Sequence, residues 1–134
     1  RQGSRTAPHY RGDGTVFGPH PRSYEQRLPR KMRQLALRGA LTAKLADGEI
    51  KVLDSFGLEA IRTKDLAGVL AALTATGRVL VVAPSADEKL RLSARNIPTV
   101  DVILADSLNV VALLRADTVV IEQPALARMQ EVYA

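Results

Sequence analysis

The sequence contains no cysteine, so it can form neither a disulfide framework nor a thiolate metal site. This absence fits a reducing cytoplasm. No apolar run approaches the roughly 20 residues that a membrane-spanning helix needs, and no signal-peptide core is present. We therefore expect a soluble, cytoplasmic protein that does not bind membranes. With 134 residues and 46% hydrophobic content, we expect one globular domain with a tail outside it.

Histidine is scarce, and nucleotide-binding patterns are absent. His9 and His20 are the only histidines, and neither has a second ligand at a metal-site spacing. No dinucleotide-binding glycine pattern follows a predicted strand, and no P-loop pattern occurs. The run Gly12-Asp13-Gly14 has no strand before it and no helix after it. The sequence therefore predicts no metal and no other cofactor.

Positive charge is concentrated at the start of the chain. Residues 1–44 carry ten Lys or Arg side chains against two carboxylates, which gives a net charge of +8. Residues 45–134 carry nine basic side chains against twelve acidic ones, which gives −3 and the total of +5. A basic segment on a mildly acidic body indicates a protein that binds a polyanion with one part only.

We interpret residues 1–27 as an extended basic arm and residues 28–134 as a globular body. Glycines, three prolines and the lack of a sustained apolar period leave residues 1–24 with too little surface to bury. Such a segment does not offset roughly 1–2 kcal/mol of backbone entropy per ordered residue. Arginines that contact phosphates and aromatic rings that stack on unpaired bases suit RNA, on which arginine-rich segments commonly fold.

The RNA-binding residues predicted in the arm are Arg1, Arg5, His9, Tyr10, Arg11, Gly12, Gly14, Phe17, His20, Arg22 and Arg27. For the three aromatic positions Tyr10, Phe17 and Tyr24 the alternative is burial where the arm meets the body.

The first body segment, residues 28–45, reads as a helix with two apolar stripes, one of which contains Leu28, Met32 and Leu35. We expect this helix to be buried on two sides. Its first half is crowded with Arg30, Lys31, Arg33 and Arg38, against the preference for acidic residues near the positive end of a helix dipole. An external anion would relieve that conflict, so these four residues are also predicted to bind RNA. The alternative is a solvated basic face.

The rest of the chain alternates short β-branched runs with helical segments. Strands are predicted at 50–53, 79–82, 100–104 and 118–121, with helices begun by caps at Thr63 and Ser85, a short helix at 109–115 and a last helix at 124–132. Gly77 is expected to close the helix that begins at Thr63. Near-continuous apolar strands indicate a parallel sheet covered on both faces. The predicted fold class is α/β: a three-layer body with a mostly parallel sheet of about four strands.

Acidic residues follow the strands of the predicted sheet and suggest a rival function. Asp54, Asp106 and Glu122 lie at carboxyl ends of strands, where open parallel sheets bind ligands. They could serve a soluble α/β enzyme, such as a phosphoryl-transfer or receiver-like domain. Asp residues at strand-to-helix junctions more often cap or turn the chain.

Several segments closely resemble bacterial large-subunit ribosomal protein four, and they occur in the same order as in that family. These segments are Arg1–Arg5, Gly12–Arg22, Leu28–Arg38, Ala94–Pro98, Leu108–Val110 and Leu114–Val120. The similarity therefore runs along the whole sequence.

The resemblance implies a structural constituent of the large ribosomal subunit and no enzyme. In this family a globular α/β body lies on the outside of the subunit, while a long basic loop threads into ribosomal RNA and helps to line the peptide exit tunnel. The implied partners are large-subunit ribosomal RNA, neighbouring ribosomal proteins and the nascent peptide. Members act early in subunit assembly, and some also bind their own messenger leader as regulators.

The family's first strand, the outgoing limb of the loop and most of its tip would precede Arg1. We therefore expect an N-terminally truncated member, in which the arm is the returning limb. The sequence departs from the family pattern at three places: His20 stands where many members have Lys, Asp13 interrupts a small-residue run, and Val111-Ala112 replaces an aromatic and an acidic residue.

Overall fold

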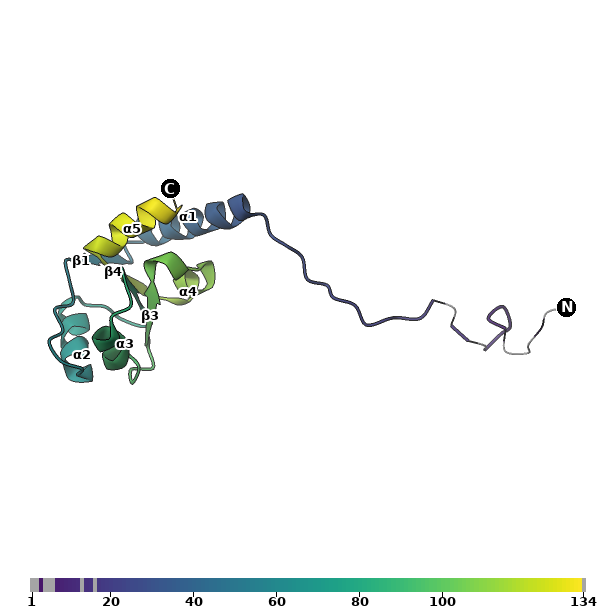
Figure 1. Ribbon diagram of the computed structural model, residues 1–134, viewed down its shortest axis with the longest axis horizontal. Helices are drawn as coiled ribbons and strands as arrows, with labels where there is room; N and C mark the ends of the chain where they lie inside the picture. Colours follow the sequence, from purple (N-terminus) through teal and green to yellow (C-terminus); the bar gives the residue numbers. More distant parts are fainter. Residues whose placement is uncertain (1–2, 4–6, 13, 16, 134) are drawn as a thin grey trace.

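A computed structural model describes residues 3, 7–12, 14–15 and 17–133 of the chain. The described residues before Arg30 form turns and extended chain, which lead away from the body (Figure 1). The body contains helices, strands and one 3-10 turn, in the order α1 (Arg30–Ala46), β1 (Ile50–Leu53), α2 (Thr63–Ala72), β2 (Val79–Ala83), α3 (Glu88–Ala94), β3 (Val100–Leu104), η1 (Ala105–Ser107), α4 (Val110–Arg115), β4 (Thr118–Glu122) and α5 (Gln123–Tyr133).

The four strands form one sheet in the order β1-β4-β2-β3, and every pairing is parallel. Val81 at the centre of β2 lies opposite Val120 of β4 on one side and Val102 of β3 on the other. All five residues of β2 are buried. This burial explains the uninterrupted apolar run of residues 79–83, because a central parallel strand has no solvent-facing side.

Helices cover both faces of the sheet and make the body three layers thick (Figure 1). On one face, residues of α1, α4 and α5 enclose a cluster with Leu80, Val119 and Ile121. On the other face, residues of α2 and α3 enclose a cluster with Val81 and Val120. The predicted three-layer α/β body with a parallel sheet is therefore confirmed.

Two predicted helix starts are wrong by one to two residues. Thr63 is the first residue of α2, and the residue before it, Arg62, occupies the N-cap position without a side-chain bond to the helix. α3 is capped by Asp87 instead of Ser85, because the Asp87 Oδ1 accepts from the Lys89 amide at 2.9 Å. At the start of α3, Ser85 and Asp87 were both candidate caps, and the path of the chain decides which side chain reaches the free amides.

Gly77 does not close α2, which ends at Ala72 and is followed by a turn in which Thr74 has a φ of 50°. Gly77 has a φ of 73°, and a Cβ built on it would lie 2.2 Å from Oδ2 of Asp117. The same Oδ2 accepts from the Arg78 amide at 2.7 Å. Glycine is therefore needed where the loop before β2 passes the loop before β4.

The first helix is buried on one side only, contrary to the sequence-based expectation. Leu37 and Ala40 of α1 lie in the core, but Leu28, Met32 and Leu35 are 53%, 55% and 69% exposed. α1 lies across α4 and beside α5 at the top of the body (Figure 1), and no described element covers its outer face. The stripe that contains Leu28, Met32 and Leu35, which was predicted to be buried, is thus exposed.

Candidate RNA interface

The aromatic side chains of the arm are not part of the body core. Tyr10 is 43% exposed, Phe17 is 93% exposed and Tyr24 is 75% exposed. The alternative that these rings are buried where the arm meets the body is therefore wrong. These exposed fractions leave ring surface accessible to partners from outside the chain, as stacking on unpaired bases requires.

Two ring contacts organise the arm locally. The rings of His9 and Tyr10 lie 4.5 Å apart with a tilt of 34°, and the Tyr10 amide donates to the Ala7 carbonyl at 3.0 Å in a turn. Further along, the guanidinium carbon of Arg22 lies 4.6 Å from the centre of the Tyr24 ring, within the range of a cation–π contact. The described arm thus presents paired flat groups at two places.

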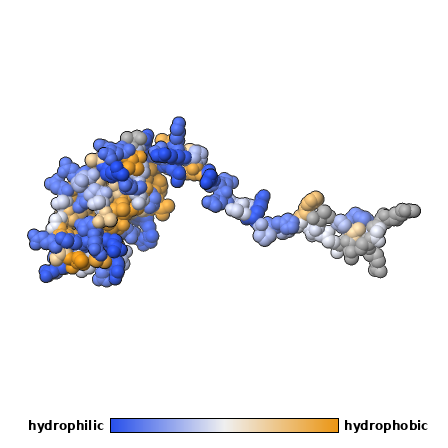
Figure 2. All heavy atoms as spheres, in the orientation of Figure 1, coloured by the Kyte–Doolittle hydropathy of each residue, from blue (hydrophilic) through white to orange (hydrophobic). Residues whose placement is uncertain are grey.

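The other predicted arm residues have little contact with the body. Arg11, Gly12, Gly14, His20, Arg22 and Arg27 are exposed. Arg1 and Arg5, which were also predicted to bind RNA, lie outside the described residues, as does Asp13. Figure 2 shows that hydrophilic residues dominate the surface from the described arm to the start of α1.

The start of α1 gathers positive charge without compensation from the protein. Pro29 occupies the N-cap position and makes no side-chain bond to the helix, and the first turn contains no acidic residue. Arg30, Lys31 and Arg33 are exposed, and among the described residues none of them forms an ion pair. Three cations at the positive end of a 17-residue helix favour a bound anion.

Arg38, the fourth basic residue predicted in this helix, has a structural contact. Its Nε donates to the Tyr133 carbonyl at 2.8 Å and so joins α1 to the end of α5. The hydroxyl of Tyr133 in turn donates to the Ala105 carbonyl at 3.0 Å. Partial burial raises the pKa of Tyr133 above its ordinary value. Nothing in the local sequence pattern around Arg38 signals this contact, because Tyr133 is 95 residues away.

A hollow of about 550 Å³ adjoins the basic cluster, between the first half of α1, the end of α5 and the segment before α4. Its lining includes the apolar side chains of Leu28, Leu108 and Val110 together with Arg30, Arg33 and Asp106, whose carboxylate is paired with Arg128. An apolar floor with a cationic rim can accept an unstacked base while the guanidinium groups contact its phosphate. Sequence reasoning missed this hollow, since its lining comes from three separate segments.

Of the three acidic strand ends that suggested an enzyme, Asp106 and Glu122 have structural contacts, and Asp54 is exposed. Both carboxylate oxygens of Asp106 accept from Arg128, at 2.8 and 3.2 Å, and these bonds raise the pKa of Arg128 above its ordinary value. Glu122 Oε1 accepts from the Phe56 amide at 3.2 Å and so holds the loop after β1. In the part of the chain that the structure describes, no three His, Asp or Glu side chains are grouped to hold a metal ion.

We expect the triple variant Asp54→Asn, Asp106→Asn, Glu122→Gln to keep its RNA affinity within about twofold. Asp54 and Glu122 do not line the hollow beside the basic cluster, and Asp106, which does, is already paired with Arg128. Filter binding with large-subunit ribosomal RNA measures this affinity. An assay of Mg²⁺-dependent phosphate release on the unaltered protein and the variant provides the second readout. A turnover that the variant loses would support the enzyme interpretation instead.

A comparison with protein families bears directly on the origin of this surface. The model of the ribosomal protein L4/L1 family matches residues 1–132, which is nearly the whole chain. The chain belongs to the ribosomal protein L4/L1 family. The resemblance seen in the sequence segments is thereby confirmed, and with it the assignment to the large subunit.

Membership of this family makes the chain a ribosomal protein with a structural role in a ribonucleoprotein that carries out translation. RNA binding is typical of the family. No helix among the described residues is long and apolar enough to cross a membrane. The geometry described above identifies the side chains of this chain that are candidates for contact with RNA.

Proposed function

We propose that this chain is a non-catalytic scaffold protein of the large ribosomal subunit, which binds ribosomal RNA through its arm and the start of α1. The observation that carries the proposal is the surface from Arg11 to Arg33, where exposed cations and aromatic rings occur with no ion pair among the described residues. A partner that supplies phosphates and unpaired bases satisfies both kinds of side chain at once.

The two parts of this surface have different roles in the proposal. Arginines at the start of α1 sit on a rigid helix that Leu37 and Ala40 fix to the body, so they set the position of the body on the RNA. The arm carries the rings and glycines that follow a folded RNA closely, and it becomes ordered on binding. The family membership supports this division, since RNA binding is typical of the family.

Further aspects of the ribosomal role follow from the same proposal. Binding by an arm that orders on RNA suits a protein that joins the subunit early in assembly, when the RNA is still open. The exposed apolar side chains of Met32 and Leu35, which do not line the hollow, form the surface that we assign to a neighbouring ribosomal protein. A contribution to the wall of the exit tunnel, with contact to the nascent peptide, is assigned to the arm, and the particle would place the protein in the cytoplasm.

The basic cluster on α1 gives a direct test through salt dependence. We expect the variant Arg30→Gln, Lys31→Gln, Arg33→Gln to bind ribosomal RNA more weakly and to reduce the slope of log K against log salt by about 2–3, since each neutralised phosphate contributes roughly 0.7–0.9. Titrations at several salt concentrations measure the slope.

A matched control removes the same charge elsewhere. Arg62→Gln, Lys64→Gln, Lys89→Gln changes three exposed cations around α2 and α3, away from the proposed surface. This control should change the slope by less than about 1. An equal decrease in slope for both variants would show that the α1 cluster is only a solvated basic face.

A further inference from the structure

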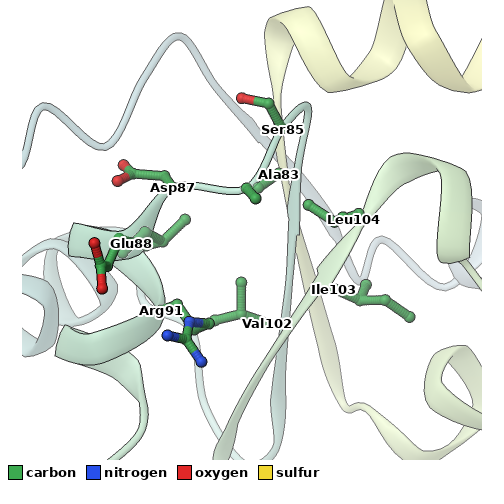
Figure 3. Close-up of a pocket in the computed structure, with 10 residues that line it drawn as sticks. Ala83, Ser85, Asp87, Glu88, Arg91, Val102, Ile103 and Leu104 are labelled. Carbon is green, nitrogen blue, oxygen red and sulfur yellow. The ribbon is translucent and has the colours of Figure 1, made fainter.

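A groove runs along the outer edge of the sheet beside β3, and the proposed RNA surface does not include it. Two hollows of about 310 Å³ each lie along the strand on the side of α3. They share Arg91 of α3 and Val102 of β3, so they are neighbours along one continuous groove. Figure 3 shows the hollow at the carboxyl end of β3, with the Val102 side chain directed into it and Arg91 beside it.

The backbone of β3 is open along this groove. Among the residues that the structure describes, β3 pairs with β2 only and is therefore an edge strand. The Thr99 carbonyl accepts from the Val79 amide of β2 at 2.8 Å. Because backbone direction alternates along a strand, Asp101 and Ile103 also face β2, while Val100, Val102 and Leu104 direct their amides and carbonyls outward. The Val100 amide has a partner there, the Ile97 carbonyl at 3.2 Å, and the carbonyl of Leu104, the N-cap residue of η1, serves the first bond of that turn. The Val100 carbonyl, both backbone groups of Val102 and the Leu104 amide therefore form the open part of the edge.

The two ends of the groove differ in chemistry. The hollow at the carboxyl end of β3 is lined mainly by apolar groups, among them Ala83, Leu90 and Leu104, with Asp87 and Glu88 at its rim. The hollow at the amino end is lined by two cations, Arg91 and Arg95, and one carboxylate, Asp101, beside Ile97 and Val100. Both arginines are exposed, and neither forms an ion pair with any described residue.

The opposite edge of the sheet is different. β1 carries Lys51, whose ammonium group donates to Thr74 O and Oγ1 at 3.1 and 2.7 Å and so ties the strand to the end of α2. A lysine on an edge strand discourages pairing with another chain. β3 has no lysine, and the cations that line the groove beside it are Arg91 of α3 and Arg95, the residue after α3. The open edge of β3 is therefore suited to pairing in a way that β1 is not.

We propose that β3 and α3 form a docking groove for an extended segment of a partner protein, which adds to the sheet as a fifth strand. The main chain of the segment pairs with Val102 and Leu104, as in other cases of strand addition to an exposed edge. Side chains two positions apart lie on the same face, about 6.5–7 Å from each other. One of them, apolar, enters the hollow near Leu104, and the other, acidic, meets Arg91 and Arg95.

Charge determines which end of the groove each of these two side chains occupies. Asp87 and Glu88 repel an acidic residue at the apolar end, and the two arginines attract it at the other end. An RNA strand would use the arginines but neither the apolar hollow nor the outward amides and carbonyls in strand geometry. A protein segment uses all three features, and this surface is separate from the arm and the start of α1.

The test is an NMR titration of the ¹⁵N-labelled 134-residue chain with two end-blocked heptapeptides, Thr-Thr-Leu-Thr-Glu-Thr-Thr and its reverse sequence. Both are used because the groove does not fix the strand direction. We expect one of them to bind with a dissociation constant in the range of about 0.1–5 mM, as suits a short peptide. The amide shifts should be confined to Val100, Val102, Leu104 and the segment from α3 to Arg95.

Paired variants separate this site from non-specific association. Val102→Lys should abolish the shifts, whereas Val52→Lys, on the 52% exposed valine of the opposite edge strand, should leave them unchanged. Arg91→Glu with Arg95→Glu changes only exposed side chains and should reverse the preference, so that a peptide with Lys in place of Glu binds about three- to tenfold better. Arg30→Gln, Lys31→Gln, Arg33→Gln should bind the peptide normally.

Several outcomes would overturn the proposal. These are the absence of β3 shifts with both peptides at 5 mM, equal binding of the Glu and Lys peptides, and undiminished binding to the Val102→Lys variant. If ribosomal RNA shifts the β3 amides while the peptides do not, the groove belongs to the RNA surface and the docking of a protein segment is wrong.

Discussion

Deletion of residues 1–24 is expected to leave a folded body and to lower the affinity for large-subunit ribosomal RNA by on the order of 100-fold. The deletion removes Arg1, Arg5, Arg11 and Arg22 together with Asp13, so the net charge falls from +5 to +2. It also removes Tyr10, Phe17 and Tyr24, and stacking of one ring on a base contributes roughly 1–3 kcal/mol. The core clusters contain no residue of the deleted segment, so cooperative thermal unfolding should persist.

A graft distinguishes recognition from charge alone. A body that carries lysine and glycine residues of equal net charge in place of residues 1–24 should regain affinity that falls steeply with salt but does not discriminate between RNAs. A competition between large-subunit ribosomal RNA and an unrelated RNA measures the discrimination. Undiminished discrimination by the deleted body would show that the arm is not the recognition element.

The second prediction concerns the stability of the fold. Two adjacent leucines of α4, one buried and one exposed, allow a controlled comparison. Leu113 is fully buried between α1 and the sheet, whereas its neighbour Leu114 is 64% exposed. We expect Leu113→Ala to lower the free energy of unfolding by about 2–5 kcal/mol, because it leaves a cavity in a close-packed core. Leu114→Ala should change it by no more than about 0.5 kcal/mol.

Urea unfolding monitored by circular dichroism gives both free energies. The two substitutions remove the same atoms from adjacent positions of one helix, so the difference between them reports burial and not helix propensity. Similar losses for both variants would contradict the packing of α4 against the sheet described here. Retention of RNA binding by the folded fraction of Leu113→Ala serves as a check that the basic surface is intact.

The parallel sheet could be predicted from the sequence because its signal is local. A run such as Val79-Leu80-Val81-Val82 has no polar position that could face solvent, and the segments between the runs have helical periodicity. Strands buried on both faces and joined by helices give a three-layer body. The order β1-β4-β2-β3 was not predicted, since it depends on which strands pair over long distances in the chain.

The exposure of α1 could not be predicted, for a physical reason. Periodicity shows which residues share a helix face, but it does not show whether another element covers that face. Met32 and Leu35 have the pattern of buried residues, and yet the elements packed against α1 reach only the side of Leu37. In a ribosomal protein an apolar stripe of this kind can be selected for contacts with other molecules, and a single chain does not reveal them.

The candidate RNA surface was predictable in its charge and not in its shape. The cations of the arm and of α1 stand out because charge asymmetry needs no fold to be visible. The tie between Arg38 and Tyr133 and the hollow near Leu28 join residues from distant segments. The groove at β3 depends on the strand order, because only that order makes β3 an edge.

A cryo-electron microscopy map of large subunits containing this protein would show directly whether the arm and the start of α1 bind ribosomal RNA. We expect continuous density for the arm within the RNA, with the Tyr10 and Phe17 rings against bases and the Arg30, Lys31 and Arg33 side chains at phosphates. A body that contacts RNA through α2 and α3, with the arm and the start of α1 in solvent, would show that this RNA surface is wrong.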